Sequence, residues 1–309
     1  MMKSFFALSP LLLWLSLSPG LRAQDAGRAQ QAPAKPAATE TPAPLPDIST
    51  LLYQVESARQ HNTTMMENYF FNATTTVHEN SGKTETRVSE ISYIHGVRLE
   101  RLIEKNGKPL APDEAAKEKE RSDKAQAKAK ARIEKAQAKG IETDSNGNEL
   151  ISLNRLLELY SVSNERREMV RGRSAIVFDF TGNHAVKTKS IPEGMLQSMN
   201  GTIWIDEKDH QIAKMTGTMA NGYRVGFGMI ISISKGAGGT IEFAPVNNEV
   251  WLPLRMEGSG HARLFLVDDA LDGTESTVFS NFHKFGSDIR MLPAENSDSG
   301  ASAPAADKP

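Results

Sequence analysis

The sequence predicts a mainly antiparallel β protein of the α+β class. The expected form is a curved half-open β-barrel of about ten or eleven strands, with helices packed on its concave side. Two observations support this. From Tyr69 to Phe285 most segments alternate apolar and polar residues with a period of two and are separated by short turns. Helical periodicity is limited to a few early segments, without the strand–helix alternation of a parallel sheet. A sheet this large must curl or close to protect its edges.

The first 23 residues read as a cleavable signal peptide. Lys3 precedes an apolar run over 5–17, and Leu21-Arg22-Ala23 offers a small residue before the expected cleavage point. The run is too short for a comfortable transmembrane helix, so no transmembrane anchor is expected. Gln24 rather than cysteine follows, which excludes a lipoprotein anchor at that residue. We therefore expect an exported protein of the periplasm.

The ends of the remaining chain differ in composition from its middle. Segments 24–46 and 293–309 are rich in Ala, Pro and small polar residues. Such sequences cannot bury enough apolar surface to offset the entropy lost on ordering. The sequence predicts a disordered linker over 24–46, a β domain over 47–292 and a disordered tail over 293–309.

The domain opens with one helix and a β-meander. Leu51, Leu52, Val55 and Ala58 recur at helical spacing after a start near Asp47 or Ser49. Extended segments over 69–77, 84–94 and 97–103 follow, joined by turn sequences.

Residues 113–139 interrupt the strand pattern with a charged segment. Lys, Glu, Ala, Arg and Gln form a helix-favouring mixture with almost no apolar stripe. Its second half is strongly basic and could contact an acidic partner or a lipid headgroup layer. A solvated helical excursion is the more common role of such a charge run.

Strands dominate the rest of the chain after a second short amphipathic helix over 151–160, which carries Leu156 and Leu157. The longest one-faced apolar row is predicted in a single strand over 223–233, where Phe227, Met229, Ile231 and Ile233 alternate with small or polar residues. The other strands are expected over 176–180, 202–206, 211–219, 240–243, 250–256, 262–266 and 277–285.

No residue pattern supports catalysis or a cofactor. The seven histidines form no H-E-x-x-H motif, and the chain has no cysteine. Ser232 and Lys235 match S-x-x-K, but they lie in a strand pattern rather than at a helix start. Removing 1–23 takes away two basic residues and leaves a net charge of about −4, which gives no attraction to nucleic acid. We expect a protein that is not an enzyme and binds no metal, cofactor or nucleic acid.

Several segments together resemble exported proteins of the LolA-like superfamily, which includes LolA, LolB and RseB. They are the amphipathic helix before Tyr69-Phe70-Phe71, the strand over 201–206, and Glu249-Val250-Trp251-Leu252-Pro253. Residues 163–168 with 176–180 are similar to an uncharacterised bacterial branch of the group. The resemblance implies a curved antiparallel sheet closed by helices around an apolar cavity for acyl chains. The charged insertion departs from the common pattern, and the missing lipobox cysteine argues against a LolB-like receptor.

The leading hypothesis is a soluble periplasmic carrier or sensor that binds a lipid or lipoprotein acyl chain in an apolar cavity. The alternative is an envelope protein-interaction module with a filled barrel, which contacts its partner through 113–139. Apolar rows of this kind are also ordinary core residues. The residues expected to line the cavity are Leu51, Leu52, Leu156, Leu157, Phe227, Met229, Ile231 and Ile233.

Overall fold

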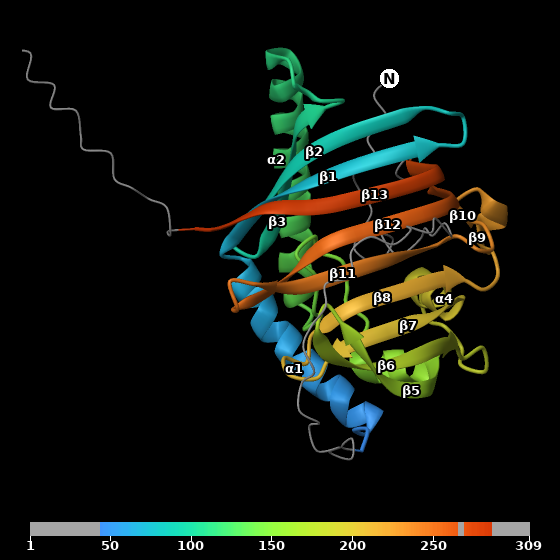
Figure 1. Cartoon of the computed structure of the whole chain (residues 1–309). Coiled ribbons are helices and arrows are strands. Elements are labelled where there is room, and N and C mark those ends of the chain that lie inside the picture. The colour runs from blue at the N-terminus through green and yellow to red at the C-terminus, as the bar shows by residue number, and fades with distance from the viewer. Residues whose placement is uncertain (1–43, 265–268, 286–309) are drawn as a thin grey trace, which may run out of the picture.

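The computed structural model describes residues 44–264 and 269–285 (Figure 1). The predicted signal peptide, most of the predicted linker and the predicted tail over 293–309 lie outside the described residues.

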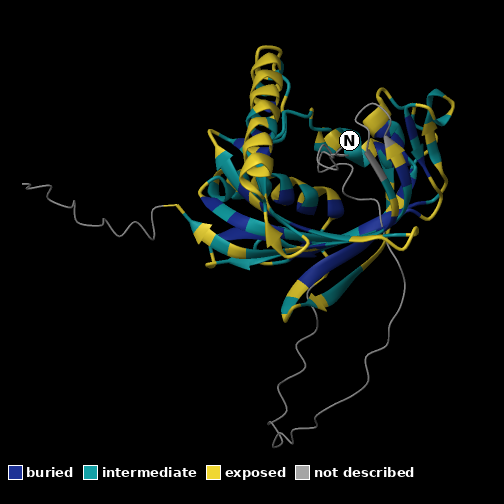
Figure 2. Cartoon of the chain, turned by 90° about the horizontal axis from the view of Figure 1, so that it is seen from above, coloured by how far each residue is buried: buried dark blue, intermediate teal, exposed yellow. Residues whose placement is uncertain are grey.

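In the described part of the chain, thirteen strands form one antiparallel sheet that is curved but not closed, which confirms the predicted fold class (Figures 1 and 2). The main path runs β4-β3-β2-β1-β13-β12-β11-β8-β7-β6-β5, and the short strands β9 and β10 pair beside β12. The strands are β1 Tyr69–Glu79, β2 Thr84–Ile94, β3 Val97–Lys105, β4 Lys108–Pro109, β5 Tyr160–Val170, β6 Arg173–Gly182, β7 Met199–Asp206, β8 Ile212–Met219, β9 Tyr223–Val225, β10 Ile231–Ile233, β11 Gly238–Val246, β12 Val250–Leu264 and β13 Asp269–Lys284.

The long strand β12 replaces two strands that the sequence analysis separated. The chain stays paired through Gly260, which lies opposite Gly273 of β13. Both glycines have positive φ angles, 144° and 147°. A Cβ at Gly273 would lie 2.0 Å from the carbonyl oxygen of His78. The glycine pair therefore lets both strands bend without ending, and the predicted break between 256 and 262 is wrong.

Helix α1, Ile48–Met66, crosses the concave side of the sheet (Figures 1 and 2). Of the two expected starts, Asp47 is the N-cap, because its Oδ1 accepts a hydrogen bond from the Thr50 backbone N–H at 2.8 Å. Its buried face comprises Ile48, Leu51 and Val55. The helix thus lies as a roof over the middle of the half-barrel.

Helix α2, Pro112–Gln137, occupies the predicted insertion and covers one edge of the sheet. Glu118 is buried against β3, where its Oε1 accepts a hydrogen bond from the Leu102 backbone N–H at 2.9 Å. The neighbouring strand β4 pairs with β3 only at Glu104 and Lys105. The helix therefore protects a strand edge that would otherwise be left largely unpaired.

Two short helices lie at the other end of the sheet. Helix α3, Leu153–Leu159, matches the second predicted helix. Helix α4, Ile191–Gln197, was not predicted, although Ser190 caps it and Glu193 follows three residues later.

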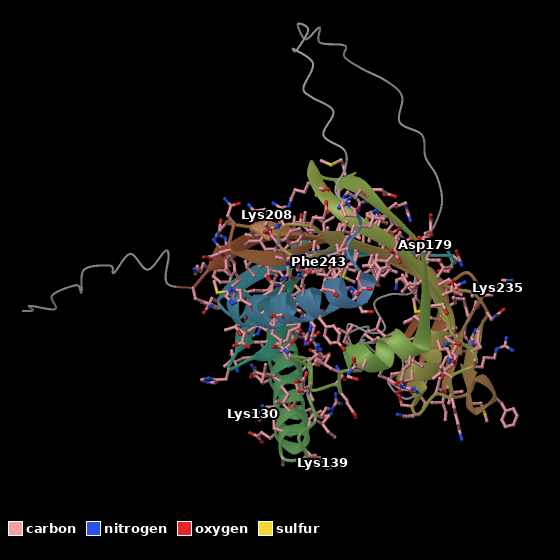
Figure 3. The ribbon with its side chains drawn as sticks, turned by 90° about the horizontal axis from the view of Figure 1, so that it is seen from below. Lys130, Lys139, Asp179, Lys208, Lys235 and Phe243 are labelled. Carbon is pink, nitrogen blue, oxygen red and sulfur yellow. The ribbon has the colours of Figure 1, made fainter. Side chains whose placement is uncertain are left out.

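The predicted single strand over 223–233 is wrong. The segment is a hairpin in which β9 and β10 flank a 3-10 turn, η1 Gly226–Gly228. The hairpin, which pairs with β12, and α2, which packs on β3, project toward the same side of the curved sheet (Figures 2 and 3). We call this open side the mouth of the half-barrel.

Candidate functional site

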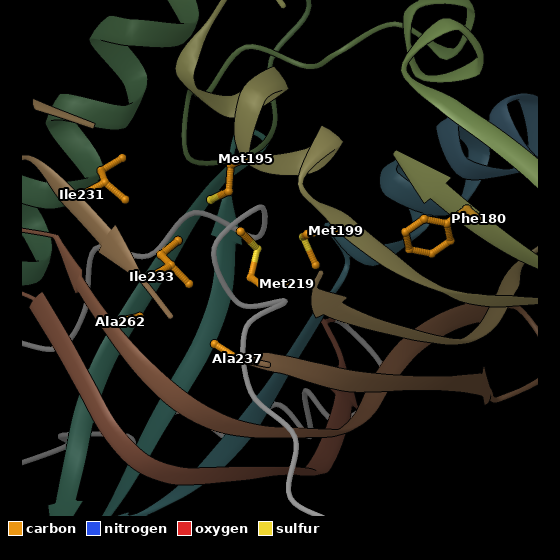
Figure 4. Close-up of a cluster of buried hydrophobic side chains, with 8 residues drawn as sticks. All are labelled: Phe180, Met195, Met199, Met219, Ile231, Ile233, Ala237 and Ala262. Carbon is orange, nitrogen blue, oxygen red and sulfur yellow. The ribbon is translucent and has the colours of Figure 1, made fainter. Parts of the chain in front are cut away.

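Beside the β9–β10 hairpin, a methionine-rich apolar cluster packs between the sheet and helix α4 (Figure 4). Three methionines from three elements meet there: Met195 of α4, Met199 of β7 and Met219 of β8. We call this set the methionine cluster; its other buried members are Phe180, Ile231, Ile233, Ala237 and Ala262. Methionine side chains adapt their shape easily, so such a cluster can accommodate varied apolar partners.

A second apolar cluster joins the first half of α1 to β6 and β7. Ile48, Leu51 and Val55 of the helix pack on Ile176, Phe178 and Ile205 of the strands. Ile203 packs against both this cluster and the methionine cluster. The apolar contacts on the concave face are therefore continuous from the roof helix α1 to the methionine cluster.

A row of four glycines crosses the concave face between these contacts. Gly201 of β7 pairs with Gly217 of β8, Gly217 pairs with Gly239 of β11, and Gly239 pairs with Gly258 of β12. Directly paired residues point to the same face of a sheet. One line across four strands thus has no side chains, which lets the sheet curl there. We call this line the glycine row.

An apolar row runs parallel to the glycine row and lies two residues away from it on each strand. Ile203, Met215, Ile241 and Met256 are paired in sequence across the same four strands. The first three are half-buried and Met256 is buried. This apolar row offers partly accessible side chains on the concave face, beside backbone that lacks any.

The eight residues predicted to line a cavity do not gather at one place. Leu51 and Leu52 pack in the α1 cluster, Ile231 and Ile233 lie in the methionine cluster, and Leu156 and Leu157 are half-buried on α3. Phe227 and Met229 lie at the tip of the hairpin and are 102% and 70% exposed. These two therefore cannot line an apolar interior, because the turn at Gly226 to Gly228 carries them outward.

An ion pair joins the two short helices beside the methionine cluster. Arg155 of α3 donates from Nε and Nη2 to the two carboxylate oxygens of Glu193 in α4, at 3.0 and 2.7 Å. Hydrogen bonds from Arg155 lower the pKa of Glu193 to about 2, against the opposing effect of burial. The backbone N–H of Lys189 also donates to Glu193, at 2.6 Å. The pair fixes the helix that carries Met195.

A second polar network anchors α1 to the far end of the sheet. Arg173 donates to both oxygens of buried Asp206, at 2.5 and 2.8 Å, and its guanidinium lies 5.4 Å from the centre of the Trp251 ring. Asn62 of α1 exchanges two hydrogen bonds with the Trp251 backbone, at 2.6 and 2.8 Å. Strands β6, β7 and β12 and the roof helix are thereby held together.

Opposing effects set the charge of Asp206. Burial by itself raises the pKa of this carboxyl group. Hydrogen bonds from Arg173 and from the backbone N–H groups of Asp209 and Lys208 outweigh burial and bring the pKa below its ordinary value. Asp206 is therefore a charged acceptor at neutral pH.

Within 44–264 and 269–285, no group of three or more histidine and acidic side chains is placed to hold a metal ion. In the same part of the chain, no helix is both long and apolar enough to cross a membrane.

Comparisons with known proteins found similar solved structures at low sequence identity. No family model and no curated protein matches the sequence. Among solved structures, a putative outer membrane lipoprotein-sorting protein domain from Vibrio parahaemolyticus is similar, with 11% identity over 77% of this chain and 94% of that one and a TM-score of 0.36. A LolA superfamily protein from Nitrosomonas europaea is 9% identical over 74% and 93% of the two chains, with a TM-score of 0.32. A DUF1329 family protein from Desulfovibrio piger is 9% identical over 78% and 94%, with a TM-score of 0.36.

Sequence reasoning missed the apolar row and the glycine row, although a pattern for them was present. Each of four strands carries a glycine two residues from a large apolar residue: G-T-I in β7 and β11, M-T-G in β8 and M-E-G in β12. The order reverses from each strand to its neighbour, as antiparallel pairing in register requires. This repeated motif could have predicted both rows.

Proposed function

We propose that this protein is a non-catalytic periplasmic carrier or sensor that binds a lipid or lipoprotein acyl chain on its concave face. The observation that carries the proposal is the half-buried apolar row of Ile203, Met215, Ile241 and Met256 beside the glycine row. An acyl chain needs an apolar surface without competing polar groups, and strand backbone whose hydrogen bonds are paired offers none.

The dimensions of the apolar row suit a flexible hydrocarbon. Four neighbouring strands span roughly 14 Å from the first to the last, given a spacing of about 4.8 Å. Each methylene group removed from water contributes about 0.8 kcal/mol, so eight buried methylenes would contribute roughly 6 kcal/mol. Met215 and the nearby methionine cluster can adjust to chains of different shape. Of the residues predicted from the sequence, six remain proposed as surroundings of the apolar row rather than as members of it: Leu51, Leu52, Ile231 and Ile233 in the two flanking clusters, and Leu156 and Leu157 on α3.

Lipid extraction and mass spectrometry of the purified protein test the proposal directly, together with titration of a fluorescent fatty acid. Met215→Gln replaces a half-buried apolar side chain with a polar one of similar length. We expect it to weaken fatty-acid binding about fivefold or more. Met169→Gln on the edge strand β5 is the matched control, because Met169 is 67% exposed. Absence of co-purified lipid together with no fatty-acid binding would exclude the proposal.

The second candidate function is a protein-interaction module of the cell envelope that uses α2. This alternative is favoured by the exposed second half of the helix, where Lys128, Arg132 and Lys135 present positive charge. Lys139, just beyond the end of the helix, is also exposed (Figure 3). Replacing the three lysines with glutamine leaves the buried contact of Glu118 intact. Loss of capture of an acidic envelope protein with unchanged fatty-acid binding would support this function over the carrier.

A further inference from the structure

The tip of the β9–β10 hairpin presents two large apolar side chains to solvent. Phe227 is 102% exposed and Met229 is 70% exposed. Both belong to one short turn, whereas Ile231 and Ile233 of the same hairpin are buried in the methionine cluster. Exposed apolar side chains that gather at one projecting site commonly mark an interaction surface.

The backbone holds this tip in an outward conformation. Gly226, Phe227 and Gly228 have φ angles of 61°, 56° and 83° in succession. Two of the three are glycines, for which such angles cost little, but a phenylalanine rarely adopts one. The backbone N–H groups of Met229 and Ile230 donate to Gly226 and Val225, at 2.9 and 3.2 Å. Unfavourable backbone angles that are kept in place by such bonds are typical of functional positions.

Positive charge surrounds the tip. Strand register places Arg224 of β9 and Arg263 of β12 on either side of Ser232, so the two exposed guanidinium groups share one face of the hairpin. Lys235 is exposed at the base of the hairpin (Figure 3). The sequence from 210 to 241 contains no aspartate or glutamate. Arg224 and Lys235 therefore flank the apolar tip on a segment without acidic side chains, whereas Arg263 lies near Asp272 of β13, whose pKa it helps to lower.

We propose that the hairpin tip docks into the surface of an anionic phospholipid membrane, with Phe227 and Met229 entering the apolar layer. Aromatic and apolar side chains favour the membrane interface, and each nearby Arg or Lys is attracted to anionic headgroups. The tip projects from the fold and has cations around it, so it can insert into a planar anionic layer. A membrane surface needs no pocket of complementary shape to receive it. The hairpin rises toward the mouth (Figures 2 and 3), so docking would turn the concave face toward the lipid. The inference stands without the proposed acyl-chain function.

Vesicle sedimentation with the full chain after processing of its predicted leader tests this proposal. We expect binding to vesicles of phosphatidylglycerol and phosphatidylethanolamine, and much weaker binding to pure phosphatidylcholine. The double variant Phe227→Ser/Met229→Ser should lower the partition coefficient about tenfold or more. Arg224→Gln should lower it about fivefold at low salt and less at high salt. Met169→Ser, which removes a similarly exposed methionine from β5, should leave it unchanged.

A tryptophan at the tip gives an independent readout. In Phe227→Trp, the added fluorescence should shift to the blue with anionic vesicles and be quenched by brominated acyl chains. Failure of the wild-type chain to bind anionic vesicles would overturn the proposal, as would equal binding by the double serine variant. A blue shift that depends on protein concentration without vesicles would assign the tip to a second copy instead. Fatty-acid titration of the same variants separates this result from a failure of the carrier function.

Discussion

Asp206→Asn tests whether the network around Trp251 holds the roof helix on the sheet. Asp206 is 1% exposed and accepts four hydrogen bonds, two from Arg173 and two from the backbone N–H groups of the following turn. Asparagine has nearly the same size and keeps one oxygen for the turn. The substitution therefore removes mainly the negative charge that faces Arg173.

The magnitude follows from how buried each partner is. Removing one member of a fully buried ion pair costs about 3–5 kcal/mol. Arg173 keeps a second carboxylate, Asp209, at 2.7 Å, and 31% of its side chain is exposed. Both features reduce the penalty, so we expect a loss of about 2–3 kcal/mol. For a domain of this size that loss lowers Tm by roughly 5–10 °C.

Urea and thermal unfolding at pH 7 measure this loss, and Arg173→Met completes a double-mutant cycle. The pKa of Asp206 is lowered in the folded protein, so its contribution is present above the ordinary carboxyl pKa and is lost as the pH falls through the folded value. The difference between the wild type and Asp206→Asn should shrink accordingly on acidification. A Tm within 1 °C of the wild type, or two single effects that simply add, would refute the reasoning.

Three further outcomes are expected. Glu193→Gln should lower Tm at pH 7. Because the pKa of Glu193 falls from 4.5 to about 2 on folding, its difference from the wild type should disappear between those pH values in acid melts. Leu51→Ala should cost about 2–5 kcal/mol in urea unfolding, since Leu51 lies on the buried face of α1 and is 2% exposed, whereas Gln54→Ala on the exposed face should cost little. Gly201→Ala should destabilise the chain by more than about 2 kcal/mol, because the new Cβ would lie 2.6 Å from the ring of Phe180. The displaced ring should show greater mobility in NMR spectra. An unchanged urea midpoint would contradict the tight packing.

The overall architecture could be predicted because period two and helical spacing are local properties of the sequence. The helix that begins after Asp47 and the charged helix over 113–139 were both expected within a few residues of their observed positions. The hairpin at 223–233 was not expected. Tyr223, Val225, Ile231 and Ile233 keep the same alternation before and after the turn, so periodicity alone cannot detect a reversal of direction. Gly226-Phe227-Gly228 was the turn sequence that should have broken the strand.

The candidate site was harder to predict, because it depends on register between strands that are distant in sequence. Ile203 and Met256 belong to one apolar row only because β7, β8, β11 and β12 align without a shift at these positions. Within one strand, the sequence shows only a glycine two positions from a large apolar residue, and this pattern by itself does not predict a row across the sheet. The residues predicted from one-dimensional patterns are instead divided between two apolar clusters, the short helix α3 and an exposed tip.

The pairing of β1 with β13 has a consequence for how the chain reaches its native state. Hydroxyl groups of Thr75 and Thr277, 202 positions apart, lie 2.8 Å from each other in the middle of the sheet. A chain that leaves its ribosome or a secretion channel from the N-terminus cannot complete this closure until nearly all of it has emerged. Closing so long a loop is slow, so β1 and β13 should pair late in refolding and in one highly cooperative step. A polypeptide truncated before β13 would leave the facing edges of β1 and β12 unpaired and accessible to chaperones and proteases.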